Sequence, residues 1–234
     1  MRVNLLQTPY WSVEHLLYLF TNTIYRHDEM NAKSATTRLG KLTDIRSGHP
    51  FRGKVKHTPD DWDFYVLQLK DVQKNGRIDI EQAIQVNMMK EMAPRPLQQG
   101  DILLRARGGY YFSGLLNVDL PNVIAVGQFF VLSPDISIID PAYLCWYLNQ
   151  PIAQQYLKKN DSGSNIPMIN KKTISNLPVK FPSLNTQHKI AEIHQNWLKQ
   201  KKLTEQLLNN REQMMRVMCQ QLINLDLMNP DFKN

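Results

Sequence analysis

The chain has 234 residues, enough for one sizeable domain with an extension or for two small domains. A hydrophobic content of 42% predicts a globular, soluble protein, and no apolar stretch approaches the 18 or so residues of a membrane span. The 28 lysines and arginines against 21 aspartates and glutamates leave a net charge of +7. This balance favours an anionic partner, nucleic acid before an acidic membrane.

The two cysteines, Cys145 and Cys219, form no metal-binding or redox pattern. A disulfide framework is therefore not expected, which is typical of a reducing cytoplasm. Glu14 and His15 interrupt the first apolar run, so the sequence does not predict a signal peptide, and we expect a cytoplasmic protein.

The first part of the chain predicts a helix, a linker and then a β-rich region. Thr8 and Pro9 are suited to start an amphipathic helix over residues 8–25, and a polar linker follows to about residue 37. Alternating and continuous apolar runs predict strands at residues 64–72, 102–104, 110–118, 123–132 and 177–181. Between the last two, Asp140-Pro141 predicts a helix start, Pro151 a break or restart, and Lys171-Lys172 a short helix.

A single long helix is predicted for residues 186 to about 224. Thr186 is suited to cap its start, and no glycine or proline follows until Pro230. Such a helix is about 57 Å long, which is longer than a small domain is wide, so its apolar stripe requires a partner helix from another molecule. The alternative is a C-terminal helix that folds back on the domain.

A basic, glycine-containing loop follows residue 45. It carries Arg46, Phe51, Arg52 and Lys54, with no acidic residue up to Pro59. A flexible basic loop with an aromatic tip is suited to phosphate contact and groove insertion, although a solvated surface loop would have the same composition.

A second candidate is the segment Arg105-Ala-Arg107-Gly108-Gly109-Tyr110. Arginines two residues apart at a strand end project from one face, and glycines permit close approach of the backbone. Arginine reads guanine edges and clamps phosphates, so we expect Arg105, Arg107 and Tyr110 to contact DNA. The alternative is a charged strand edge with a tight turn.

Further polar residues come before the short helix near residue 171. Ser164 and Asn165 belong to a small loop, and Lys171 and Lys172 open the helix. Backbone amides at a helix start favour an anion, although an ordinary surface loop fits equally well.

An enzymatic alternative rests on Asp60 and Lys70, which loosely match the PD-(D/E)xK nuclease pattern. Gln68 stands where that pattern has an acid, and metal-dependent cleavage needs carboxylates to hold Mg²⁺. The six histidines form no metal spacing. The motifs of the chain thus favour a binding module, with Lys70 as a further DNA contact, over a catalyst.

An ordered series of segments resembles the specificity subunits of type I restriction–modification systems. The segments are LGKLTDIRSG (39–48), PFRG (50–53), VLQLKDV (66–72), QGDILL (99–104), YLCWYL (143–148), LPVKFP (177–182) and QHKI (187–190). Each is weak alone, and their order and spacing over about residues 38–225 carry the resemblance.

The resemblance implies an α+β fold of half-length form: an N-terminal helix and linker (1–37), one β-rich target-recognition domain (38–185), and one spacer helix and tail (186–234). It implies a non-catalytic protein that directs a methyltransferase (M) subunit, which uses S-adenosylmethionine to methylate adenine N6, and in some systems a restriction (R) subunit. The chain itself would hold no metal or cofactor.

Full-length members of the family carry two recognition domains separated by two antiparallel helices. The resemblance therefore implies a homodimer of half-subunits, paired as an antiparallel coiled coil, on a bipartite palindromic site. The expected interface residues are Ile190, Ile193, Trp197, Leu207, Met214, Met218 and Leu222. A coiled-coil adaptor without a DNA role remains an alternative.

Overall fold

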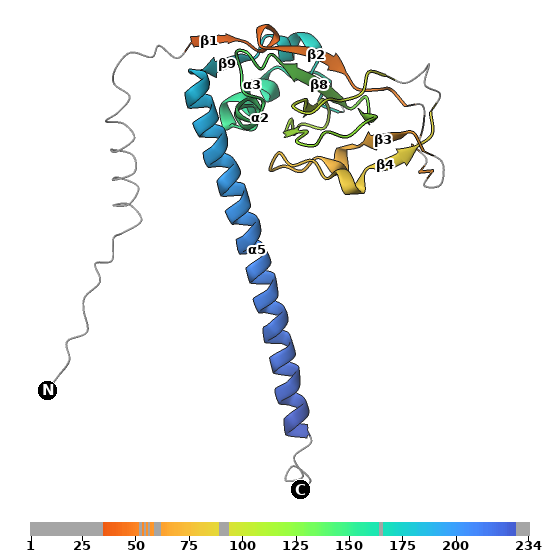
Figure 1. Ribbon diagram of the computed structural model, residues 1–234, viewed down its shortest axis with the longest axis vertical. Coiled ribbons are helices and arrows are strands. Elements are labelled where there is room, and N and C mark those ends of the chain that lie inside the picture. Colours follow the sequence, from red (N-terminus) through yellow and green to blue (C-terminus); the bar gives the residue numbers. More distant parts are fainter. Residues whose placement is uncertain are drawn as a thin grey trace, which may run out of the picture. The chain divides into compact units, whose positions relative to one another are not determined.

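The computed structural model describes residues 35–51, 53, 55, 57–58, 62–88, 94–163 and 166–227. The expected helix at residues 8–25 lies outside them. The predicted α+β fold with a long C-terminal helix is confirmed (Figure 1). No helix in the described part of the chain is long and apolar enough to span a membrane.

Nine strands form three sheets among the described residues. The largest is antiparallel and has the order β2 (Thr43–Ser47), β8 (Phe129–Pro134), β5 (Ile102–Arg105), β6 (Ser113–Leu115). The second has the order β4 (Ile84–Val86), β3 (Phe64–Leu67), β7 (Val123–Ala125), with β3 and β7 parallel. The third pairs β1 (Ala35–Arg38) with β9 (Pro178–Phe181).

The four-stranded sheet is buried on both faces, which explains its continuous apolar strands. In β5, Ile102 and Leu104 belong to one hydrophobic cluster, while Leu103 between them belongs to another. Since side chains alternate across a strand, one face packs on helices and the other on the second sheet. The first cluster includes residues of α2 (Pro141–Leu148), α3 (Pro151–Lys159) and α4 (Lys171–Ser175).

Three predicted strands are shorter than expected. The stretch 64–72 ends as β3 at Leu67, because Asp71 turns back to accept the Gln68 amide and closes the 3₁₀ turn η2 (Leu69–Asp71). The stretch 123–132 divides at Val126-Gly127 into β7 and β8, which lie in different sheets. Of 110–118, only β6 pairs as a strand.

Helices α2 and α3 begin at the residues that the sequence predicts. The Asp140 side chain accepts the Tyr143 amide, at 2.7 Å, and Pro141 and Pro151 occupy first turns, as predicted. Two further 3₁₀ turns are η1 (Leu39–Lys41) and η3 (Ile80–Gln82).

The long helix, α5 (Leu184–Leu227), begins two residues before the predicted cap. Ser183, and not Thr186, has the capping hydroxyl, which lies 3.4 Å from the Thr186 amide. Buried Gln187 fixes the first turns to the domain, since it accepts the Asp140 amide and donates to the Pro182 carbonyl. Beyond half-buried Leu198, every side chain described on α5 is exposed.

Candidate nucleic-acid interface

Three of the residues predicted to contact DNA line one hollow of about 750 Å³, which we call the Arg107 hollow. They are Phe51 from the segment after β2, Lys70 from η2 and Arg107 from the loop after β5. The fold thus brings together side chains that are far apart in the sequence.

Gly48 allows the segment that carries Phe51 to cross the β7–β8 turn. A Cβ atom at Gly48 would lie 2.2 Å from the Val126 carbonyl oxygen, so no other residue fits there. The Gly48 amide donates to the Phe129 carbonyl, at 2.9 Å, and the Phe51 ring packs edge-on against His49, 4.8 Å between centroids. The aromatic side chain is therefore held at the rim of the hollow.

Lys70 is held beside a buried carboxylate. Its Nζ atom lies 3.6 Å from Oδ1 of Asp71 and 3.4 Å from the Gln82 carbonyl oxygen. Burial raises the pKa of Asp71, although the Gln68 amide and Lys70 act in the opposite direction. The Lys70 side chain remains 56% exposed, so its ammonium is available to an anion in the hollow.

The loop that carries Arg107 is stabilised by hydrogen bonds from Arg105 and to the segment around Pro167. Nε of Arg105 donates to the Arg107 carbonyl, at 2.7 Å, and a Cβ at Gly108 would lie 2.7 Å from the Arg105 guanidinium. The Gly108 amide donates to the Pro167 carbonyl, at 2.9 Å. Arg105 therefore shapes the loop, whereas the exposed Arg107 side chain has no partner among the described residues.

Tyr110 lies at the other end of this loop with two lysines that the sequence analysis missed. Its ring is 60% exposed, with Nζ of Lys74 and Nζ of Lys158 at 5.5 and 5.4 Å from the centroid. We call this group the Tyr110 cluster. No described carboxylate pairs with either ammonium. Positions 74, 110 and 158 carry no shared sequence signal, because only the fold brings them together.

Arg46 is engaged by the domain itself. Its guanidinium donates to the carbonyls of Arg95 and Pro96 and to Oδ2 of buried Asp101, at 3.1–3.3 Å. The same carboxylate accepts the Gln98 amide and the Ser133 hydroxyl. The Arg46 side chain, 22% exposed, therefore ties β2 to the segment before β5.

Of the remaining predicted DNA contacts, the two that the structure describes do not line the hollow. Lys171 and Lys172 are exposed on α4. Arg52, Lys54, Ser164 and Asn165 lie outside the described residues, as does Asp60 of the nuclease alternative. In the part of the chain that the structure describes, no three His, Cys, Asp or Glu side chains gather in a possible metal site.

The predicted interface residues of α5 divide into two groups. Ile190 packs against the core of its own domain. The others are 52–69% exposed: Ile193, Trp197, Leu207, Met214, Met218 and Leu222. This apolar surface is uncovered in a single chain.

Comparison with known proteins agrees with the fold. A similar fold occurs in a structure of a type I restriction–modification system that concerns its complex assembly and conformational transition. One chain of that structure superposes on this chain with a TM-score of 0.60, at 17% sequence identity, and the match covers 90% of this chain. The HsdS subunit from Thermoanaerobacter tengcongensis superposes with a TM-score of 0.57 at 14% identity, and the match covers 84% of this chain. The S subunit from M. genitalium superposes with a TM-score of 0.53 at 17% identity, and the match covers 85% of this chain. The present chain spans about half the length of these three, 48–50%.

Sequence comparison gives the same family. Over 107 residues, 43% of this chain, it is 30% identical to the type I restriction enzyme HindI specificity subunit of Haemophilus influenzae, and 23% of that protein is covered. The model of the type I restriction modification DNA specificity domain matches residues 94–213, more than half of the chain. The chain therefore belongs to the family of type I restriction–modification DNA specificity domains.

Proposed function

We propose that this chain is a non-catalytic subunit that reads a DNA sequence for a type I adenine-N6 methyltransferase. It would direct the M subunit, which carries S-adenosylmethionine, and an R subunit where the system has one, to a bipartite site on cytoplasmic DNA. The observation that carries the proposal is the Arg107 hollow, where an aromatic ring, a lysine and an unpaired arginine meet in a domain of the specificity family.

The chemistry of the hollow suits a base edge next to a phosphate. Arginine donates two hydrogen bonds to the guanine edge, whereas lysine supplies a point charge for the backbone. We assign base reading to Arg107 and backbone contact to Lys70 and the Tyr110 cluster. Arg52, Lys54, Ser164, Asn165, Lys171 and Lys172 remain proposed contacts on the same domain.

The functional unit would be a homodimer formed through α5. One recognition domain and one spacer helix make up half of the arrangement that the family resemblance implies for full-length subunits. The apolar side chains exposed on α5 would be covered by a second α5, antiparallel to the first. A twofold dimer presents two identical domains, so its target is a gapped palindrome.

Replacing Arg107 by alanine tests base reading. We expect a loss of about 1–3 kcal/mol in binding free energy at one position of each half-site, with that position becoming degenerate. The measurement is selection from a random duplex library by the chain assembled with its M subunit. Lys180→Ala, at an exposed position on β9, is the control for charge. Equal weakening on every sequence would make Arg107 a phosphate contact instead.

Removing both lysines of the Tyr110 cluster should weaken binding uniformly. For a Lys74→Gln, Lys158→Gln double variant, the plot of log affinity against log salt concentration should become shallower by about 3.6, because the dimer loses four phosphate contacts and each accounts for about 0.9. Base preference should not change. Lys159→Gln with Lys41→Gln removes the same charge from exposed positions outside the cluster and should leave the slope within about 0.5 of wild type. An unchanged slope in the first variant would remove the cluster from the interface.

A further inference from the structure

The Arg107 hollow has an apolar floor besides its two cationic side chains. The floor consists of side chains that belong to the second hydrophobic cluster or pack against it: Phe51, Val55, Leu69, Ile84 and Val126. Val126 is buried, and the other four are half-buried. A guanine edge and a phosphate present polar atoms to Arg107 and Lys70, so these two contacts leave the apolar floor without a partner.

Backbone pairing holds the floor in place. Ile84 of β4 pairs with Val66 of β3, and the Val126 amide donates to the Leu67 carbonyl, at 3.1 Å. Leu69 is the first residue of η2, which follows β3 closely. The floor therefore needs no rearrangement to take an apolar group, and a preorganised surface loses little conformational entropy when it binds.

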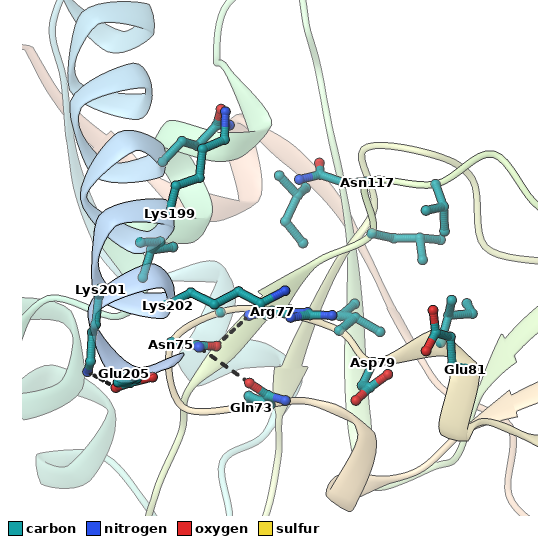
Figure 2. A pocket seen from close by; sticks show the side chains of 18 residues that line it. Gln73, Asn75, Arg77, Asp79, Glu81, Asn117, Lys199, Lys201, Lys202 and Glu205 are labelled. Carbon is teal, nitrogen blue, oxygen red and sulfur yellow. Dashed lines mark hydrogen bonds and ion pairs between the residues drawn. The ribbon is translucent and has the colours of Figure 1, made fainter. Parts of the chain in front are cut away.

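The charge of the Arg107 hollow distinguishes it from a second hollow of about 670 Å³. That one lies between α5 and the loops that precede η3 and follow β6, and Figure 2 shows Asp79, Glu81 and Glu205 among the side chains around it. Carboxylates repel phosphates, so the second hollow is the poorer match for DNA. No Asp or Glu is among the described residues that line the Arg107 hollow, where the charged side chains are Lys70 and Arg107.

We propose that the floor of the Arg107 hollow takes the C5-methyl group of a thymine next to the guanine that Arg107 reads. The inference deepens the DNA recognition proposed above and rests on it. The thymine methyl is the apolar group that base edges present in the major groove, and phenylalanine is among the side chains that contact it. Arg107 and the floor line one hollow, and successive bases are about 3.4 Å apart along a strand, so the two readings fall on neighbouring base pairs.

Deoxyuridine in place of thymine tests the contact, because it removes the methyl group and keeps every hydrogen-bonding atom of the base pair. The protein is the chain assembled with its M subunit, and the duplex carries the motif that this complex selects. Deoxyuridine at the proposed thymine should weaken binding about fourfold in one half-site and about 15-fold in both, because one buried methyl group is lost from each. Deoxyuridine in the gap between the half-sites is the control and should leave the affinity unchanged.

A variant of the floor ties the methyl effect to the hollow. In Phe51→Ala the difference between the thymine and deoxyuridine duplexes should shrink to about twofold or less in both half-sites together. Both duplexes are compared on the same protein, so any loss of folded protein cancels from the ratio. Ile136→Ala truncates an apolar side chain that is 75% exposed and outside the hollow, and should keep the full difference.

The outcomes separate this inference from the recognition function. Equal affinity of the wild-type complex for the two duplexes, while its binding stays sequence-specific, overturns the methyl contact. A difference that Phe51→Ala retains in full overturns it too, as does a selected motif with no thymine beside the position that Arg107→Ala makes degenerate. A complex that binds every duplex equally contradicts the proposed recognition itself.

Discussion

A Leu207→Asp variant is expected to be monomeric at concentrations where the wild-type chain is dimeric. Leu207 lies on the exposed part of α5 and is 52% exposed in a single chain. In the proposed dimer each copy would bury the new carboxylate in the apolar seam, and twofold symmetry places this cost in the interface twice. The dimer dissociation constant should rise at least about 100-fold, which corresponds to about 2.8 kcal/mol.

The fold of the Leu207→Asp domain should be unaffected, because α5 is fully exposed beyond Leu198. Asn209→Asp introduces the same charge about 200° further round the helix, outside the proposed seam, and is the matched control. Analytical ultracentrifugation over a concentration series measures both variants. A Leu207→Asp protein of unchanged dimer mass would exclude α5 from the interface.

The second large effect is expected from Asp101→Ala, which should destabilise the domain that holds the three sheets by about 3 kcal/mol. The Asp101 carboxylate accepts hydrogen bonds from the Arg46 guanidinium, the Gln98 amide and the Ser133 hydroxyl. Its removal leaves a partly buried arginine and an amide without their acceptor. The loss falls at the low end of the range for a buried pair, since Arg46 is 22% exposed and retains two carbonyl partners.

Thermal unfolding at one fixed protein concentration should show this change as a midpoint lowered by about 6–12 °C. Asp44→Ala removes an exposed carboxylate from the same strand as Arg46 and should shift the stability by less than about 0.5 kcal/mol. An Asp101→Ala midpoint equal to that of Asp44→Ala would mean that the Arg46–Asp101 contacts do not stabilise the domain.

Arg46 also illustrates a limit of the sequence analysis. That Arg46 contacts DNA stays a prediction, and the structure adds hydrogen-bond partners that lie 49–55 residues further along the chain. No local pattern marks a partner at that separation. Arg105 also stays a predicted DNA contact, and the structure adds that its guanidinium shapes the loop that carries Arg107.

Local signals predicted the helices well, because caps and prolines act within a few residues. Asp140-Pro141 and Pro151 gave the starts of α2 and α3, and the long interval without glycine or proline gave α5. The short strands β1, β2 and β4 were missed, because strands of three to five residues are defined by distant partners: β2 pairs with β8 and β1 with β9. In the same way Phe51, Lys70 and Arg107 were each predicted singly, while their common hollow required the fold.

The most direct measurement is single-molecule methylation mapping of DNA from a host without this methylation, in which the chain is expressed with its M subunit. We predict one new adenine-N6 methylation motif that is gapped and palindromic, and that is absent when the M subunit is expressed alone. An asymmetric motif would keep the recognition function and contradict the symmetric dimer. The absence of any new motif, although the two proteins purify as a complex, would contradict sequence recognition by this chain.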